Sequence, residues 1–99
     1  MDILPTIKPL VDTIRKHDKN LADQIQRAAT SVVLNHAEAD GSDAGNRRAR
    51  IHTAKRSLAE ARRGLLIGAA WGYVARDEVE RVDAVLDRVA AMSWRRLHG

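Results

Sequence analysis

The sequence predicts an all-α protein, an antiparallel up-down-up-down four-helix bundle with a short first helix. Apolar residues recur at intervals of three and four in four stretches of the chain, which is the spacing of one helix face. Short segments rich in Gly, Asp and Asn separate these stretches, and no stretch shows the alternation of a strand. Helices joined by short connections pack antiparallel, so we predict a single four-helix-bundle domain over residues 1–99.

The composition is that of a small globular protein without a cofactor. The 99 residues are 44% apolar and 30% charged, which suffices for one modest core. The absence of cysteine excludes disulfides and thiolate zinc sites. The N-terminus lacks the pattern of a secretory signal, and the longest uncharged run, residues 64–75, is shorter than the roughly 20 residues of a membrane span. We therefore expect a cytoplasmic protein with no membrane segment.

Two prolines confine the first helix. With Thr6 as its N-cap, Pro9 falls at the third helical position, where no intrahelical N–H bond is lost. We expect this helix to end near His17, which makes it the shortest of the four. Its apolar residues keep helical spacing: Ile7, Leu10, Val11 and Ile14.

Two longer helices come next. The second begins after Asp18 as N-cap, and we expect Gly41 to adopt the left-handed conformation after its last turn. Its apolar stripe is Leu21, Ile25, Ala28, Ala29, Val32, His36 and Ala39. The third runs from about Ala44 to Trp71, and Gly72 ends it. Its core face is Ile51, Ala54, Leu58, Ala61, Leu65 and Ala69.

The fourth helix begins near Arg76. Acidic residues near its start, and Arg95 and Arg96 near its end, suit the helix dipole. Its core seam is Val79, Val82, Leu86, Val89, Ser93 and Leu97. Because the first helix is much shorter than the other three, part of their apolar surface should lack a cover within the chain, and we expect another subunit to supply it.

The sharpest functional pattern is a basic arc on the third helix. Residues 41–63 contain seven of the 17 Lys and Arg against two acids, a charge of +5, whereas the rest of the chain has 10 basic and 11 acidic residues. The arc spans about 120° of the helix surface. Its members are Arg48, His52, Lys55, Arg56, Arg62 and Arg63. Such a face is typical of contact with the phosphates of RNA or DNA, to which His52 would add a weak, pH-dependent donor.

Two other interpretations of the arc stay open. One is a solvated face that keeps the protein soluble. The other is a contact with an acidic line on the fourth helix of another subunit, formed by Glu80, Asp83 and Asp87. No Gly-rich loop and no recognition-helix motif supports sequence-specific reading. Any binding should therefore be directed at the nucleic-acid backbone.

A polar line crosses the second and third helices. It consists of Arg27, Ser31, Asn35, Glu38, Ser57 and Glu60. The two carboxylates suggest acid–base chemistry, but hydrogen bonds between the helices or at a subunit seam, with Arg27 as the partner of Glu60, are the simpler interpretation. We therefore predict a structural line, no catalytic residues and no enzyme activity.

Three further residues are assigned structural roles. His36 lies in an apolar stripe, and His17, His52 and His98 are not spaced to complete a metal site, so we predict a core or interface histidine and no metal. Trp71 and Trp94 are expected near opposite ends of the bundle as packing residues rather than as platforms for nucleic-acid bases.

Residues 21–73 also carry a family resemblance. The run Gln24, Arg27, Ala28, Ala29, Ser31, Val32, Asn35, Ala37 and Glu38, followed by Ser57, Glu60, Gly72 and Tyr73, resembles the pattern of the 23S ribosomal RNA intervening-sequence proteins. Order, spacing and helix ends agree with that pattern. His36, Ala39 and Arg56 depart from it, since the family usually has Ile, Gly and Gly at these positions.

The resemblance implies an antiparallel four-helix bundle that assembles with itself, commonly as a homopentamer. A group similar in fold, the accessory variability determinant of diversity-generating retroelements, binds nucleic acid through a basic pentamer surface and partners a reverse transcriptase. The resemblance thus implies RNA or DNA as a partner and, in the retroelement branch, a reverse transcriptase. A scaffold oligomer without a nucleic-acid role is the alternative, and the residues do not distinguish the two.

Overall fold

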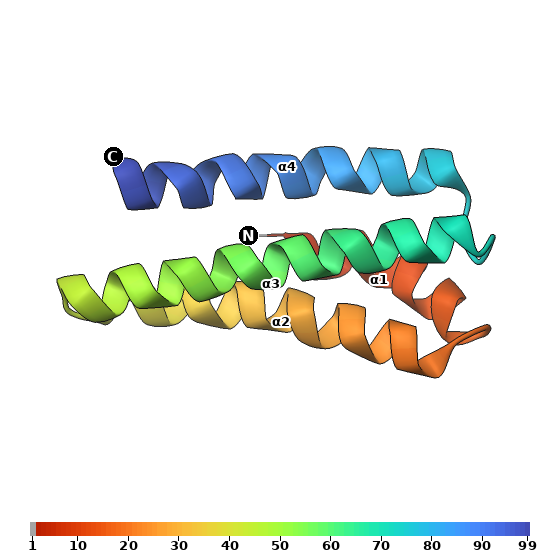
Figure 1. Ribbon diagram of the computed structural model, residues 1–99, viewed down its shortest axis with the longest axis horizontal. Coiled ribbons are helices and arrows are strands. Elements are labelled where there is room, and N and C mark those ends of the chain that lie inside the picture. Colours follow the sequence, from red (N-terminus) through yellow and green to blue (C-terminus); the bar gives the residue numbers. More distant parts are fainter. Residues whose placement is uncertain (1) are drawn as a thin grey trace.

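Four helices and no strand make up residues 2–99, the part of the chain that the computed structural model describes (Figure 1). They are α1 (Ile3–Arg15), α2 (Lys19–Asp40), α3 (Ala44–Ala70) and α4 (Arg76–His98). Each helix packs against the one before it, and α1 also contacts α4. The prediction of an all-α four-helix bundle with a short first helix is confirmed.

The start of α1 differs from the prediction. The helix begins at Ile3 rather than after Thr6, and the Thr6 hydroxyl donates to the Asp2 carbonyl oxygen at 2.6 Å. Pro9 therefore lies inside the helix and not in its first turn. The extra turn places Ile3 in the core with 1% of its surface exposed, and this burial offsets the hydrogen bond that Pro9 cannot make.

Side-chain caps start α2 and α3, the first of them at Asp18 as predicted. The Asp18 carboxylate accepts from the backbone N–H of Leu21 at 3.0 Å, and the Asp43 carboxylate accepts from that of Asn46 at 2.9 Å. Both bonds satisfy N–H groups that have no partner inside the helix. Asp18 and Asp43 thus fix where α2 and α3 begin.

Glycine ends only one of these helices in the left-handed conformation. The prediction for Gly41 is wrong, because its φ is −98° and the Ser42 hydroxyl caps the Glu38 carbonyl oxygen at 2.7 Å instead. Gly72 has a φ of +79°, and the Tyr73 N–H donates to the carbonyl oxygen of Gly68 at 2.9 Å. This second arrangement is a Schellman motif, in which glycine avoids the penalty of a side chain.

Two glycines within α3 bring the helices close together. A Cβ atom on Gly64 would lie 2.5 Å from Cγ1 of Ile25 on α2, and one on Gly68 would lie 2.8 Å from Cδ1 of Ile14 on α1. Both isoleucines are fully buried. The absence of a side chain at these two positions therefore lets α3 pack directly on its neighbours.

We expect Gly64→Ala to destabilise the protein. Overpacking of this kind costs about 1–3 kcal/mol, whereas alanine gains about 1 kcal/mol over glycine within a helix. Gly45→Ala is the matched control, because a Cβ there would be 3.7 Å from its nearest neighbour. Urea unfolding followed by circular dichroism should show a lower midpoint for Gly64→Ala only. Equal midpoints for the two variants would contradict the close packing.

The short α1 leaves one end of the bundle to three helices. It has 13 residues against 27 in α3, and Figure 1 shows that it stops well before the end at which α3 begins and α4 finishes. At that end α2 and α4 meet through His36 and Ser93, which are 4% and 0% exposed. A buried polar contact closes the core there, and apolar side chains without a cover within the chain remain on the long helices, such as Leu34 at 54% and Leu66 at 49% exposed.

The hydrogen bonds of His36 define its protonation state. Arg96 lies 2.9 Å from Nδ1, and since a guanidinium only donates, Nδ1 accepts. The Ser93 hydroxyl donates to the Val89 carbonyl oxygen at 3.0 Å, so Nε2–H of His36 donates to the Ser93 oxygen at 2.8 Å. His36 is therefore neutral, with its proton on Nε2. Burial, and then the charge of Arg96, lower its pKa, while the nearby Asp40 opposes the shift.

This network predicts an acid-sensitive stability. In the unfolded chain His36 titrates near the ordinary value of about 6.5, and its pKa is lower in the folded chain. The unfolded state thus binds more protons in this range, so the contribution of His36 is full above about pH 6.5 and is lost as the pH falls toward the folded pKa. We expect the free energy of unfolding to fall between about pH 7 and pH 5.

The matched variants for this prediction are His36→Gln and His52→Gln. Glutamine at position 36 can accept from Arg96 and donate to Ser93 without titrating, so its variant should lose most of the pH slope. His52 is exposed, and its variant should keep the slope of the unmodified protein. Urea unfolding at several pH values measures both. A slope unchanged in His36→Gln would refute the assignment.

Candidate nucleic-acid interface

The packing of α3 positions the basic arc on the outside of the bundle. Ile51, Ala54, Leu58, Ala61 and Leu65 are all buried, as predicted for its core face. The arc lies to one side of them, with Arg48 and Arg62 at the border between α3 and α4 and Arg56 farther from it. Four of its members are exposed: Arg48, His52, Arg56 and Arg63. The other two, Lys55 and Arg62, are half-buried.

Arg62 is neutralised within the chain. Its guanidinium donates two hydrogen bonds to the Asp83 carboxylate, at 2.7 and 2.8 Å, and approaches Asp87 at 3.5 Å. The bonds to Asp83 raise the pKa of Arg62 further above its ordinary value. The acidic line of α4 thus faces the arc of its own chain, rather than only being available to another subunit. Arg62 joins α3 to α4 and is not free to contact a phosphate.

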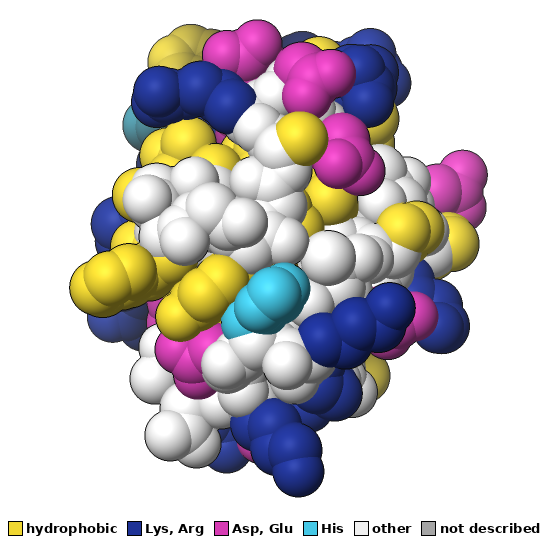
Figure 2. All heavy atoms as spheres, turned by 90° about the vertical axis from the view of Figure 1, so that its right-hand side faces the viewer, with side chains coloured by type: hydrophobic (Ala, Val, Ile, Leu, Met, Phe, Trp, Pro, Cys, Tyr) yellow, Lys and Arg dark blue, Asp and Glu magenta, His cyan; other side chains and the backbone are white. Residues whose placement is uncertain are grey.

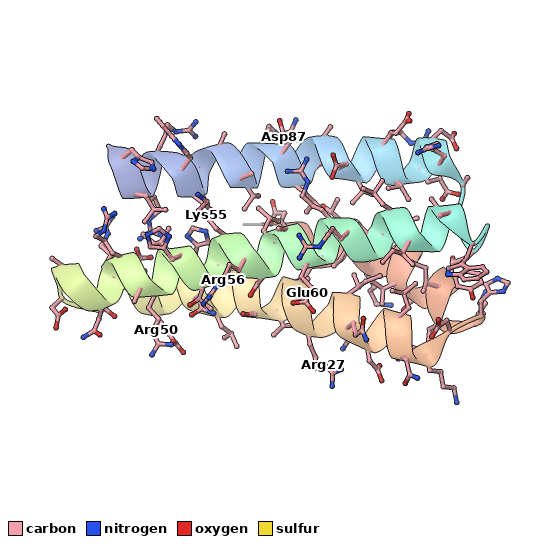
Figure 3. The ribbon with its side chains drawn as sticks, viewed as in Figure 1. Arg27, Arg50, Lys55, Arg56, Glu60 and Asp87 are labelled. Atoms are coloured by element: carbon pink, nitrogen blue, oxygen red, sulfur yellow. The ribbon has the colours of Figure 1, made fainter. Side chains whose placement is uncertain are left out.

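The other members keep their charge. The Arg48 guanidinium donates to the carbonyl oxygen of Leu97 at 3.0 Å, which caps the end of α4 without a carboxylate. Within residues 2–99 no carboxylate lies within ion-pair distance of Arg48, Lys55, Arg56 or Arg63. Figure 3 shows Lys55 directed toward α4 and Arg56 directed away from it. The arc is therefore a spread of separate positive charges.

The net charge of the protein gathers at the end of the bundle that α1 does not reach. Residues 38–56 and 91–99 meet there and carry seven Lys and Arg against three acids, which is +4, while the rest of the sequence has ten residues of each sign. Two acids at this end already pair with arginines, Glu38 with Arg50 and Asp40 with Arg96. We call this region the basic end; its unpaired members are Arg47, Arg48, Lys55, Arg56 and Arg95.

Sequence reasoning missed Arg47 and Arg95 as parts of this surface. Arg95 is distant from the arc in the chain, and only the antiparallel packing of α3 and α4 brings it to the same end. The signal in the sequence that could have identified Arg95 was the set of basic residues in the last turn of α4, which suit the helix dipole. At the opposite end, Figure 2 shows Lys and Arg, Asp and Glu, and hydrophobic side chains interspersed.

The structure divides the polar line in two. Ser31 and Ser57 hydrogen-bond across α2 and α3 at 2.8 Å, and the Asn35 amide donates to the backbone oxygen and hydroxyl of Ser31 at 2.8 and 3.0 Å. These three residues come together as small polar contacts between the helices. Arg27, Glu38 and Glu60 are exposed and lie outside this cluster.

The expected pair of Arg27 with Glu60 does not form among residues 2–99. Figure 3 shows the Arg27 side chain extending away from α3, and because Glu60 is also exposed, neither charge requires a buried partner. Glu38 pairs with Arg50 at 2.7 Å, and Glu60 follows Arg50 by ten residues on α3. The two carboxylates are thus about 15 Å apart along the bundle, too far to act on one bond.

The described part of the chain shows neither a cluster of metal ligands nor a membrane-spanning helix. No three His, Asp or Glu side chains of residues 2–99 come together in a way that could hold a metal ion. None of its four helices is long and apolar enough to cross a lipid bilayer.

Comparison with known proteins assigns the family. The family model described as 23S rRNA-intervening sequence protein matches residues 3–95, which is nearly the whole chain. The chain belongs to the 23S rRNA-intervening sequence protein family. The resemblance carried by residues 21–73 is therefore confirmed and extends over all four helices. No curated protein and no solved structure matches this chain.

The ion pair of Arg62 predicts that substituting this residue destabilises the protein more than substituting the neighbouring Arg63. Arg62→Met removes two charged hydrogen bonds at a half-buried site and should lower the free energy of unfolding by about 1 kcal/mol. Arg63→Met is the control, because Arg63 is exposed and its variant should change stability by less than about 0.5 kcal/mol. Urea unfolding measures both, and equal effects would show that the Arg62 contacts contribute nothing.

Proposed function

We propose that this member of the 23S rRNA-intervening sequence protein family is a non-catalytic homo-oligomer that binds RNA or DNA without sequence specificity. The contacts are made by the basic face of α3, chiefly Arg48, His52, Lys55, Arg56 and Arg63, with Arg62 holding that face against α4. The observation that carries the proposal is the concentration of the whole net charge, +4, at the basic end, where two of the three local acids are already paired with arginines.

The proposed contacts are with phosphates. Separate Lys and Arg side chains on a convex helix neutralise a nucleic-acid backbone but do not reach base edges in a groove. With about four phosphates neutralised per chain, raising the salt from 50 to 200 mM should lower affinity about 50-fold for a single strand and about 150-fold for a duplex. Salt sensitivity of this size is therefore expected.

Self-assembly would strengthen such weak contacts. Several copies of the basic end on one oligomer bind a long nucleic acid together, and each contact after the first forms at a high effective concentration. Exposed apolar side chains support an oligomer: Leu34 of α2 is 54% exposed, and Leu66 and Ile67 of α3 are 49% and 47% exposed. The homopentamer, and a place in an RNA or retroelement complex beside a reverse transcriptase, belong to the proposal through the family resemblance.

A scaffold oligomer without nucleic acid is the second candidate. It is favoured by the same exposed apolar side chains, which need a protein partner whether or not RNA or DNA binds. In that case the charges of the basic end would serve solubility alone. The two candidates differ in one observable, which is nucleic-acid binding at low salt.

Charge reversal at the basic end tests the proposal. We expect Lys55→Glu combined with Arg56→Glu to weaken binding of a labelled 20-nucleotide RNA by about tenfold or more at about 50 mM salt, measured by fluorescence anisotropy. Lys19→Glu with Arg76→Glu is the matched control. These residues are exposed, belong to the first turns of α2 and α4, and change the net charge by the same amount.

The outcomes separate the candidates. Weaker binding by the Lys55 and Arg56 variant alone supports the site. Equal losses in both double variants would mean that only the overall charge matters. No binding by the unmodified protein at about 50 mM salt, together with an oligomeric mass unaffected by nuclease, would favour the scaffold.

A further inference from the structure

Trp94 does not have the packing role that the sequence suggested. Its side chain is 56% exposed on the outer surface of α4, while Ser93 and Leu97 on either side of it in the sequence face the core. The ring of His98 lies against it, with centroids 4.5 Å apart and planes inclined by 37°. A large aromatic group is thus exposed on a helix and supported from one side by His98.

The register of α3 and α4 places Trp94 beside the basic arc. Arg62 pairs with Asp83 and Arg48 caps Leu97, so in both pairs the α3 and α4 residue numbers add to the same total. By that register Trp94 is level with the turn of α3 that contains His52, between Arg48 and Lys55. Trp94 also follows Asp83 by eleven residues, about three full turns, and so shares the side of α4 on which Asp83 meets Arg62.

The chemistry along this border changes at Asp87. Before it, acids of α4 face the arc and neutralise Arg62. After it, residues 88–99 contain no acid, and the border offers Trp94 and His98 beside unpaired cations. An exposed indole flanked by positive charges is the combination that stacks a nucleic-acid base while neighbouring cations hold the phosphates.

We propose that Trp94 is a base-stacking platform and that the basic end therefore prefers single-stranded RNA or DNA to a duplex. This inference rests on the proposed function and names its ligand class. The bases of a duplex are already stacked on one another, and an aromatic ring on the surface of a helix cannot reach their faces. An unpaired strand can turn one base onto the indole while its phosphates lie along Arg48 and Lys55.

The test compares Trp94→Ala with Trp71→Ala, Trp71 being the matched control. Trp71 is 70% exposed but follows α3 at the opposite end of the bundle, within an uncharged run. The probes are a labelled 15-nucleotide RNA of mixed sequence and its duplex with the complementary strand, at about 50 mM salt. We expect Trp94→Ala to weaken binding of the single strand about 5- to 100-fold and that of the duplex less than about twofold.

Two measurements distinguish stacking from a change in charge or folding. Trp94→Phe should keep most of the affinity, since it retains an aromatic face. The loss caused by Trp94→Ala should be similar at about 50 and 200 mM salt, because stacking releases no counterions, whereas the loss caused by Lys55→Glu should shrink. Circular dichroism of the Trp94 variants should match that of the unmodified protein, because this side chain is exposed.

A direct spectroscopic test uses Trp71→Phe, which leaves Trp94 as the single tryptophan. Adding the unlabelled single strand should quench its fluorescence, and the duplex should not. Two results together would overturn the inference: fluorescence that is quenched as the protein concentration rises in the absence of RNA, and a smaller oligomeric mass for Trp94→Ala. They would assign Trp94 to a contact with a second copy of the chain.

The inference and the proposed function can fail separately. If single strand and duplex bind equally and depend on Lys55 and Arg56 but not on Trp94, the basic end is a nucleic-acid site without a stacking platform, and only the inference fails. If neither probe binds the unmodified protein, the proposed function fails and the inference fails with it.

Discussion

The unequal length of the helices is the constraint on which the rest of the structure depends. α1 has 13 residues and α3 has 27, so four helices surround the core in one part of the bundle and three in the other. Three helices alone leave a gap, and a direct contact of α2 with α4 fills it through His36, Ser93 and Arg96. A neutral buried histidine at this point replaces the apolar cover that a longer α1 would supply, and it makes that end sensitive to acid.

The same end carries the net charge, and the register between α3 and α4 determines how. Arg62 meets the acidic line of α4, which removes its charge from the surface, while Arg48 meets a backbone carbonyl oxygen and keeps its own. A shift of one turn would place the acids beside Lys55 and cancel a different part of the arc. The position of the proposed interface is therefore a consequence of helix packing and not of the composition of α3 alone.

Periodicity and capping chemistry were sufficient to predict the four helices, their buried faces and the cap at Asp18, because these depend on neighbours within the same helix or turn. Three of the failures share one cause. The start of α1, the role of Arg62 and the exposure of Trp94 depend on which helix lies opposite and at what level, and a helical wheel contains no such information. For Arg62 the partner is 21 residues away on another helix, and the wheel could show only that its charge was available.

Part of the exposed apolar surface lies away from the basic end. Leu66 and Ile67 belong to the last turns of α3 and Trp71 follows them, within an uncharged run, whereas Lys55 and Arg56 belong to earlier turns of the helix. An oligomer that covers the apolar part would leave the basic end open to a partner, because α3 rises about 1.5 Å per residue and about 15 Å separates the two groups. Self-assembly and binding of a polyanion are thus compatible on one helix: each copy adds a positive surface without covering that of its neighbour.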